Sequence, residues 1–406
     1  MSPVLTEIDI KKRDRRIIFI CWLAYTAAYI GRLNYSASIV AVVENLGITK
    51  ADAGLVSSFF FFAYGAGQIV NGILSKKYNS KIMIFASLIS SSVLNLIMPL
   101  CGDISVMKFV WMFNGVAQSV LWSTLIKTLS DNVSDKMLPK AILVMSTTVA
   151  VGTFSSYGIS ALCVNSGAWQ TVFFVASAVL AISALVWISL YGKNGKRSVE
   201  PGKAEEPKVK MSKGIITALA VTCFAGVANG FIKDGINTWV PSVLYEEFDI
   251  SQSFSIMLTL LLPLISTCGA AIIKKIHEKI KSHSVMNFIM FTLSAVICGG
   301  ILLSMKAHSL LSIMLCFICI ACCMAMINNV ITSMFALDNR KFLNAGFAAG
   351  LLNTFCYIGS TVTSYSLGAV SQEKGWNAVF IIMLSVCVLA SAACLAGYII
   401  QKKTER

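Results

Sequence analysis

The sequence has 406 residues, of which 56% are hydrophobic and only 13% are charged, with a formal net charge of +14. A water-soluble protein of this size could not cover so much apolar surface with so few charged side chains. The composition therefore excludes an ordinary soluble protein and indicates a protein embedded in a lipid bilayer.

Twelve apolar runs follow one another along the chain. They are residues 17–43, 53–75, 82–102, 105–129, 141–164, 168–191, 214–243, 254–273, 285–305, 309–335, 346–371 and 376–400. A helix of about 20 apolar residues crosses the hydrocarbon layer, so each run is long enough to span it. Helices are expected because they satisfy their own backbone hydrogen bonds where water is absent. The predicted fold class is an all-α integral membrane protein with twelve transmembrane helices.

The Lys and Arg residues gather in alternate segments between these runs. The N-terminal segment is rich in them, whereas the segments on the opposite side hold only single residues, namely Lys50, Lys108, Lys306 and Lys374. Basic loops stay on the cytoplasmic side of a membrane. We therefore predict a multi-pass protein of the plasma (inner) membrane with both termini in the cytoplasm. The basic charge is a sign of this topology, so we expect no nucleic-acid partner.

The first predicted helix carries a positive charge deep within the membrane, at Arg32. Such a charge is costly in lipid, so it normally faces a cavity or a partner and marks a functional site. Tyr25, Tyr29 and Arg32 are spaced i, i+4 and i+7, which places them on one helix face. We predict that this face binds a ligand. The alternative is that the two tyrosines only pack against neighbouring helices.

Five amide side chains lie within the predicted spans and are further candidates for substrate binding. They are Asn34, Gln68, Gln118, Asn237 and Asn353. An amide in a membrane helix can equally form a hydrogen bond that joins two helices. The sequence leaves both interpretations open.

The longest polar stretch, 192–213, lies between the sixth and seventh runs. It contains Pro201 and Pro207 together with Glu, Lys, Gly and Ser, a composition typical of a flexible linker. The predicted domains are an N-terminal six-helix bundle over 1–191, a cytoplasmic linker over 192–213, and a C-terminal six-helix bundle over 214–406.

The two halves of the sequence also resemble each other. Arg32 and Lys233 stand near the end of the first span of each half, and Trp169 and Trp376 open the sixth span of each half. These matches indicate a duplicated six-helix unit. Two such pseudo-symmetric bundles place a substrate site at their interface, near the middle of the membrane.

The seventh predicted helix carries the adjacent pair Lys233 and Asp234. With Arg32, they are the only ionisable Asp, Glu, Lys, Arg or His residues deep in the predicted spans. Two cations against one carboxylate leave a positive site, which suits a compact dianion such as phosphate through charge-assisted hydrogen bonds. Asp234 is a possible coupling group or a static charge partner.

Buried proton carriers are scarce in this sequence, because Asp234 is the only deep carboxylate. A proton-driven symporter needs a carboxylate or His that loads and unloads a proton within the membrane. The pattern therefore favours the exchange of one anion for another. Proton coupling through Asp234 remains the alternative.

The spans contain no Ser-His-Asp set, carboxylate pair or His-rich cluster, so we predict that the chain is not an enzyme. Cys316, Cys319 and Cys322 follow at about one helical turn, yet no His or carboxylate lies near them in sequence. We interpret them as small buried hydrophobes. We expect no cofactor, no metal ion and a functional monomer.

Several segments resemble the organophosphate:phosphate antiporter family of the major facilitator superfamily. They are YIGRLNY in helix one, AYGAGQIVNGILSKKYNSK in helix two, WMFNGVAQSVLW in helix four, KDGINTWVPSVL in helix seven and AGFAAGLLNTFCYIGS in helix eleven. The resemblance implies that Arg32 and Lys233 occupy the family's two phosphate-binding positions, with Lys in place of the second Arg. It also implies that Gln118 and Trp122 belong to the family's helix-four pattern.

The resemblance implies a transporter that exchanges a phosphorylated metabolite for inorganic phosphate by alternating access. Two alternatives stay open. One is a proton-coupled permease of the same superfamily for another small metabolite or drug, and the other is a transporter-like sensor of sugar phosphates.

Overall fold

The structure is a computed structural model that describes residues 7–74, 79–134, 136–191, 212–339, 342–343 and 345–404. Within these ranges the chain is helical and contains no strand. The predicted linker, 192–213, lies outside the described residues apart from its last two positions.

The first half of the chain forms helices that are mostly long and apolar. They are α1 (Glu7–Ala37), α2 (Ile39–Leu46), α3 (Lys50–Leu74), α4 (Ser80–Ile97), the 3-10 turn η1 (Met98–Leu100), α5 (Ile104–Ser119), α6 (Leu121–Asn132), α7 (Leu138–Asn165) and α8 (Trp169–Tyr191). Helix α2 ends at Gly47, whose φ of 60° is a left-handed conformation that a glycine adopts without strain.

The second half begins with α9 (Lys213–Phe248). It continues with α10 (Gln252–Thr259), α11 (Leu261–Lys279), α12 (His283–Lys306), α13 (Leu310–Asn329), the π-helix η2 (Val330–Met334), α14 (Phe335–Asp338) and α15 (Ala345–Thr404). Serine side chains cap the first turns of α9, α10, α12 and α13, where each accepts a hydrogen bond from a backbone N–H three residues later. Helix α15 is in fact two helical arms that meet at Gly375, which has a φ of 74°.

Ten stretches of the described chain are long and apolar enough to cross a membrane. The sequence predicted twelve runs, and the difference has two sources. The single stretch Phe347–Lys403 contains two predicted runs, joined at the Gly375 bend. The eighth predicted run, 254–273, includes positions whose side chains the structure does not describe, and its described part is the shorter apolar helix Gln252–Ser266.

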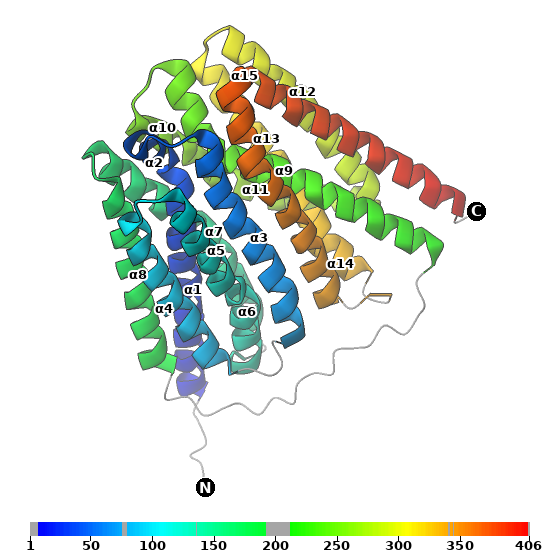
Figure 1. Cartoon of the computed structure of the whole chain (residues 1–406). Coiled ribbons are helices and arrows are strands. Elements are labelled where there is room, and N and C mark those ends of the chain that lie inside the picture. Colours follow the sequence, from blue (N-terminus) through cyan, green and yellow to red (C-terminus); the bar gives the residue numbers. More distant parts are fainter. Residues whose placement is uncertain are drawn as a thin grey trace.

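The two halves meet along α3 and the first arm of α15, which pack against each other over most of their length. In Figure 1 the helices lie close together at the top, whereas their lower ends diverge toward the separated N- and C-termini. A Cβ atom on Gly54 of α3 would lie 2.1 Å from the carbonyl oxygen of Ser364, and one on Gly368 would lie 2.5 Å from that of Lys50. Glycine is therefore required where these two helices cross.

Polar side chains join the halves near this crossing, where α3 begins and α9 ends. The Lys50 Nζ atom lies 2.5 Å from Glu246 Oε2, and the same carboxylate accepts a 2.9 Å hydrogen bond from Trp376 Nε1. The amide of Gln252 donates to the carboxylate of Glu44. We call this end of the molecule, defined by these five residues, the closed end.

Candidate functional site

Helix α1 places Arg32 in the interior, where only 7% of its surface is exposed. Its Nε donates a 3.1 Å hydrogen bond to Gln118 Oε1 on α5. The guanidinium carbon lies 4.3 Å from the ring centroid of Tyr64 and 4.8 Å from that of Tyr29, which are cation–π distances. The Nη2 atom of Arg32 has no hydrogen-bond partner in the described part of the chain. A buried donor of a charged group is therefore available to a ligand.

A buried network of amides fixes the orientation of Gln118. Its Nε2 donates to Ser91 Oγ at 2.9 Å and to the carbonyl oxygen of Gly31 at 3.3 Å. The Asn114 amide donates to the same carbonyl at 3.0 Å. Because its nitrogen is bound in this way, Gln118 presents its oxygen to Arg32. Gln118 thus positions the Arg32 guanidinium. Its own side chain is fully buried and also joins α5 to Ser91 on α4 and to Gly31 on α1.

Helix α9 carries the second cation beside a carboxylate. The Lys233 Nζ atom lies 3.6 Å from Asp234 Oδ1, and Asp234 Oδ2 accepts a 2.5 Å hydrogen bond from Ser360 Oγ on α15. The Lys233 side chain is 30% exposed, whereas that of Asp234 is 11% exposed. The ammonium group is therefore the accessible member of the pair.

Tyrosine side chains connect the two cations. Tyr29 lies within electrostatic range of both Arg32 and Lys233. The ring of Tyr64, on α3, lies 4.8 Å from that of Tyr357, on α15, and Tyr357 is in range of Arg32. Arg32 on α1 and the pair Lys233 and Asp234 on α9 thus share Tyr29 as a neighbour, where helices of the two halves meet.

Tyr25 continues the same face of α1 away from Arg32. Its ring lies 5.2 Å from Tyr29 in an edge-on arrangement and 4.8 Å from the ring of Trp122. Trp122 is 37% exposed, so one side of this aromatic stack is open. Tyr25 and Trp122 thus extend the site lined by Tyr29.

The structure does not gather all the predicted amides around the two cations. Asn34 donates to Asn95 Oδ1 on α4 at 2.8 Å and so joins two helices of the first half. Asn353 donates to Gln68 Oε1 at 2.5 Å, which links α15 to α3. Asn237 uses its backbone carbonyl to accept a 2.8 Å hydrogen bond from Tyr157.

Tyr64, Tyr357 and Ser360 also lie beside the charged residues, and no pattern in the sequence singled them out. All three lie in segments that resemble the antiporter family, in AYGAGQIVNG and NTFCYIGS. Nothing in a single sequence distinguishes an aromatic residue that lines a site from one that packs in lipid. These residues are identified by the packing of α3 against α15, which is visible only in the folded chain.

The fold and the site define a helical membrane protein with one buried cation, Arg32, and one half-buried cation, Lys233, at the junction of its halves. The family model of the Major Facilitator Superfamily matches residues 21–364, and the chain belongs to this family of membrane transporters. It is therefore a multi-pass membrane transporter and not an enzyme.

Two curated relatives align over nearly their whole length. The "Probable hexose phosphate transport protein" of Chlamydia trachomatis is 21% identical over 96% of this chain and 92% of its own. The "Membrane sensor protein UhpC" of Escherichia coli is 21% identical over 98% of this chain and 96% of its own. The resemblance to organophosphate transporters and their relatives, seen in the sequence, is confirmed.

Among solved structures, the fold is similar to that of a bacterial homologue of the human lysosomal transporter Spinster, in an inward-facing and occupied conformation. The TM-score is 0.78 at 14% identity, over 95% of this chain and 97% of the other. This likeness supports the all-α transporter fold.

Proposed function

We propose that this chain is a secondary transporter that exchanges a phosphorylated organic anion for inorganic phosphate across the plasma (inner) membrane. The observation that carries the proposal is the pair of interior cations, Arg32 and Lys233, beside which Asp234 is the only carboxylate paired with either among the described residues. A site with this balance of charge attracts a dianion. The relative from Chlamydia trachomatis, named for hexose phosphate transport, supports the same class of substrate.

The proposed binding mode uses the groups that the protein leaves available. Arg32 offers Nη2, and Lys233 offers its partly exposed ammonium group. Tyr29 lies in range of both, so its hydroxyl would donate to the same anion. Tyr25 and Trp122 would contact the organic part of the substrate. Of the amides, Gln118 would act through Arg32, while Asn34, Gln68, Asn237 and Asn353 would contribute through the helix contacts described above.

We further propose twelve membrane crossings in two six-helix bundles, 1–191 and 214–406, acting as a monomer. The two arms of α15 would cross separately, and α10 with α11 would form one crossing interrupted at Leu260. Basic residues flank both termini and stay in the cytoplasm. The closed end would then face outward, and the conformation would be one that opens to the cytoplasm.

Counterflow of phosphate tests this proposal. Purified protein is placed in liposomes preloaded with unlabelled phosphate, and the uptake of labelled phosphate is measured. We expect saturable uptake that requires internal phosphate, is inhibited by sugar phosphates, and is lost in Arg32→Ala. The matched control is Lys306→Ala, because Lys306 is an exposed cation at the end of α12. Absence of uptake by folded wild-type protein would overturn the exchange mechanism.

A sensor is the second candidate, because the relative UhpC is named as a membrane sensor protein and aligns over 98% of this chain. A sensor would bind the same anion at the same two cations. It would show saturable binding of a sugar phosphate without counterflow. Measuring both quantities on one preparation distinguishes the two functions.

A further inference from the structure

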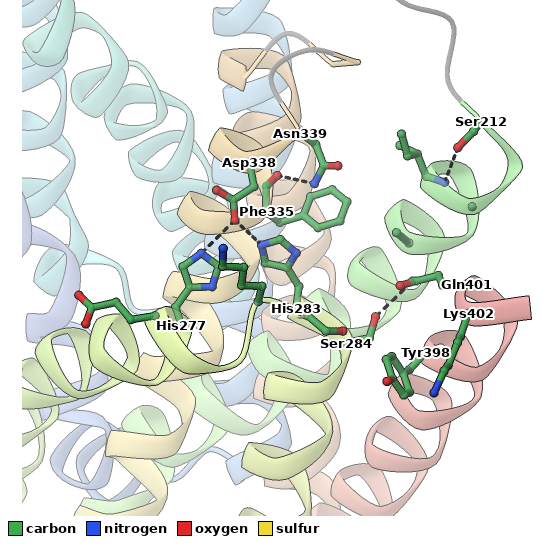
Figure 2. A pocket seen from close by; sticks show the side chains of 16 residues that line it. Ser212, His277, His283, Ser284, Phe335, Asp338, Asn339, Tyr398, Gln401 and Lys402 are labelled. Atoms are coloured by element: carbon green, nitrogen blue, oxygen red, sulfur yellow. Dashed lines mark hydrogen bonds and ion pairs between the residues drawn. The ribbon is translucent and has the colours of Figure 1, made fainter. Parts of the chain in front are cut away.

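Two histidines and one aspartate meet at the end of the second half that is remote from the closed end. His277 lies in the last turn of α11, His283 is the first residue of α12, and Asp338 is the last residue of α14. The Nε2 atoms of His277 and His283 lie 3.0 and 2.9 Å from the same atom, Asp338 Oδ2. Figure 2 shows both rings pointing at this oxygen.

These three side chains present potential metal ligands at close range. One nitrogen from each ring and one carboxylate oxygen all lie within 4.8 Å of one another. In the observed arrangement the Asp338 carboxylate accepts from both rings, so each Nε2 carries the proton that it donates. A metal ion would replace the proton on His277 Nε2, and the imidazole would then carry its proton on Nδ1. This Nδ1 atom is buried and has no partner among the described residues that would oppose the change of tautomer.

The spacing is close to that of a zinc site. Ligands about 2.0–2.2 Å from a tetrahedral zinc ion lie about 3.3–3.5 Å apart, so the two N–O separations need to widen by only a few tenths of an ångström. The two imidazoles would approach each other, and their ring centroids are 5.6 Å apart at present. Two histidines and one carboxylate leave a fourth position for water.

The cluster opens onto a cavity of about 900 Å³, which gives an ion and its water a path to the site. The Asp338 side chain is 46% exposed, and Glu278 lines the same cavity. Lys281 and Lys402 also line it. Their charges oppose a free cation, so binding depends on direct coordination by the three ligands and not on the general field of the cavity.

We propose that His277, His283 and Asp338 form a binding site for a divalent transition-metal ion of the zinc class. The ligands come from three helices that belong to the same half of the molecule, α11, α12 and α14. Metal binding would fasten these helices to one another and would not join the two halves. The ion is thus a stabilising element of the second half, separate from the two cations of the proposed transport site.

Titration of the full-length, detergent-solubilised protein with Co²⁺ and then Zn²⁺ tests the site. We expect one Co²⁺ ion per protein, an absorption spectrum of nitrogen and oxygen ligands, its displacement by Zn²⁺, and a higher melting temperature. In His277→Gln the affinity falls by about 10-fold or more and the thermal shift disappears. The control is His308→Gln, which changes a histidine outside the cluster and keeps both effects.

His283 also packs against Phe335, with ring centroids 5.4 Å apart, so its replacement costs stability for a second reason. His277→Gln and Asp338→Asn are for this reason the decisive variants. Equal metal affinity in these two variants and in the wild type would overturn the site. A spectrum with thiolate-to-cobalt charge transfer would assign the ion to cysteines and overturn it equally, as would the absence of saturable binding.

Discussion

The two interior cations differ in how the protein compensates their charge. Arg32 is surrounded by neutral groups, namely the Gln118 oxygen and the rings of Tyr29 and Tyr64. Lys233 has a full negative charge beside it, on Asp234. The half that holds Arg32 thus keeps an uncompensated charge, whereas the half that holds Lys233 contains an ion pair.

This difference suggests that Arg32 and Lys233 have different roles in anion exchange. In the proposed exchange Arg32 would bind the anion, because its buried Nη2 has no protein partner in the described structure. Lys233 would exchange its ion pair with Asp234 for one with the substrate, since its Nζ lies 3.6 Å from the carboxylate and its side chain is partly exposed. We infer that Arg32 holds the anion and that Lys233 responds to its arrival.

The largest expected effect comes from exchanging the two cation types. Arg32→Lys should reduce phosphate counterflow by about 100-fold, because a lysine cannot bind Gln118, stack on two rings and reach the anion together. Lys233→Arg should retain exchange within about 10-fold, since a guanidinium can pair with both Asp234 and phosphate. The measurement is the initial rate of counterflow at saturating phosphate.

Equal loss in both variants would show that the site is symmetric and would contradict the different roles of Arg32 and Lys233. Size-exclusion chromatography of each variant checks that the protein is folded. Lys306→Ala again serves as the control for a change of charge at the surface.

The next effect concerns the amide that orients Arg32. Gln118→Leu removes the hydrogen bond to Arg32 Nε and the one to Ser91, whose hydroxyl still donates to Asn114. A hydrogen bond to a charged group contributes about 1.5–3 kcal/mol, so we expect the KM for phosphate to rise by about 20-fold. The rise is measured by counterflow over a range of phosphate concentrations.

Asn34→Leu is the matched control for this experiment. Asn34 is equally buried and joins α1 to Asn95, yet no hydrogen bond from its side chain to Arg32 is present among the described residues. It should lower thermal stability and leave the KM unchanged. A similar KM in Gln118→Leu and the wild type would contradict the positioning role of Gln118.

A smaller effect is expected when the carboxylate beside Lys233 is neutralised. Asp234→Asn keeps an acceptor for Ser360 but removes the charge that competes with the substrate. We expect the KM for phosphate to fall by about 5-fold, because a nearby opposite charge in this setting contributes on the order of 1 kcal/mol. Exchange should continue and should need no pH gradient.

Ser360→Ala is the control, since it removes the hydrogen bond and keeps the carboxylate. If uptake by the wild type is driven by a pH gradient without internal phosphate, and Asp234→Asn abolishes it, the carboxylate is a proton carrier. That result would replace anion exchange by proton coupling.

Much of the fold could be predicted from the sequence, because each membrane helix leaves a local apolar signal. The residues at which each helix begins and ends could not be predicted, since they depend on backbone geometry at single residues. Leu260, between α10 and α11, falls inside the predicted run 254–273, and the bend at Gly375 falls between two predicted runs. In both places the pattern of apolar residues does not say whether a helix ends or only bends.

The deep charges stand out in the sequence, because a charge within a membrane helix is rare, and their role in binding stays a prediction. The residues that surround these charges could not be predicted from the sequence. Tyr64 and Tyr357 meet across 293 positions of sequence only because α3 packs along α15. The cluster of His277, His283 and Asp338 is hidden for the same reason, because the aspartate comes from a helix distant in sequence.

The smallest expected effect concerns the amide pair Gln68 and Asn353, for which the sequence leaves two roles open. Their hydrogen bond links α3 to α15, beyond Tyr64 and Tyr357 as seen from the closed end. Such a bond contributes about 0.5–1.5 kcal/mol, so its loss should change the rate of exchange by about 3-fold at unchanged KM. If the hydrogen bond only joins the two halves, the rate of exchange should change by the same factor in Gln68→Ala, in Asn353→Ala and in the double variant. Either substitution alone removes the whole interaction. Additive effects that raise the KM would instead mean that each amide contacts the substrate separately, and the site would then extend from Arg32 along α3 and α15.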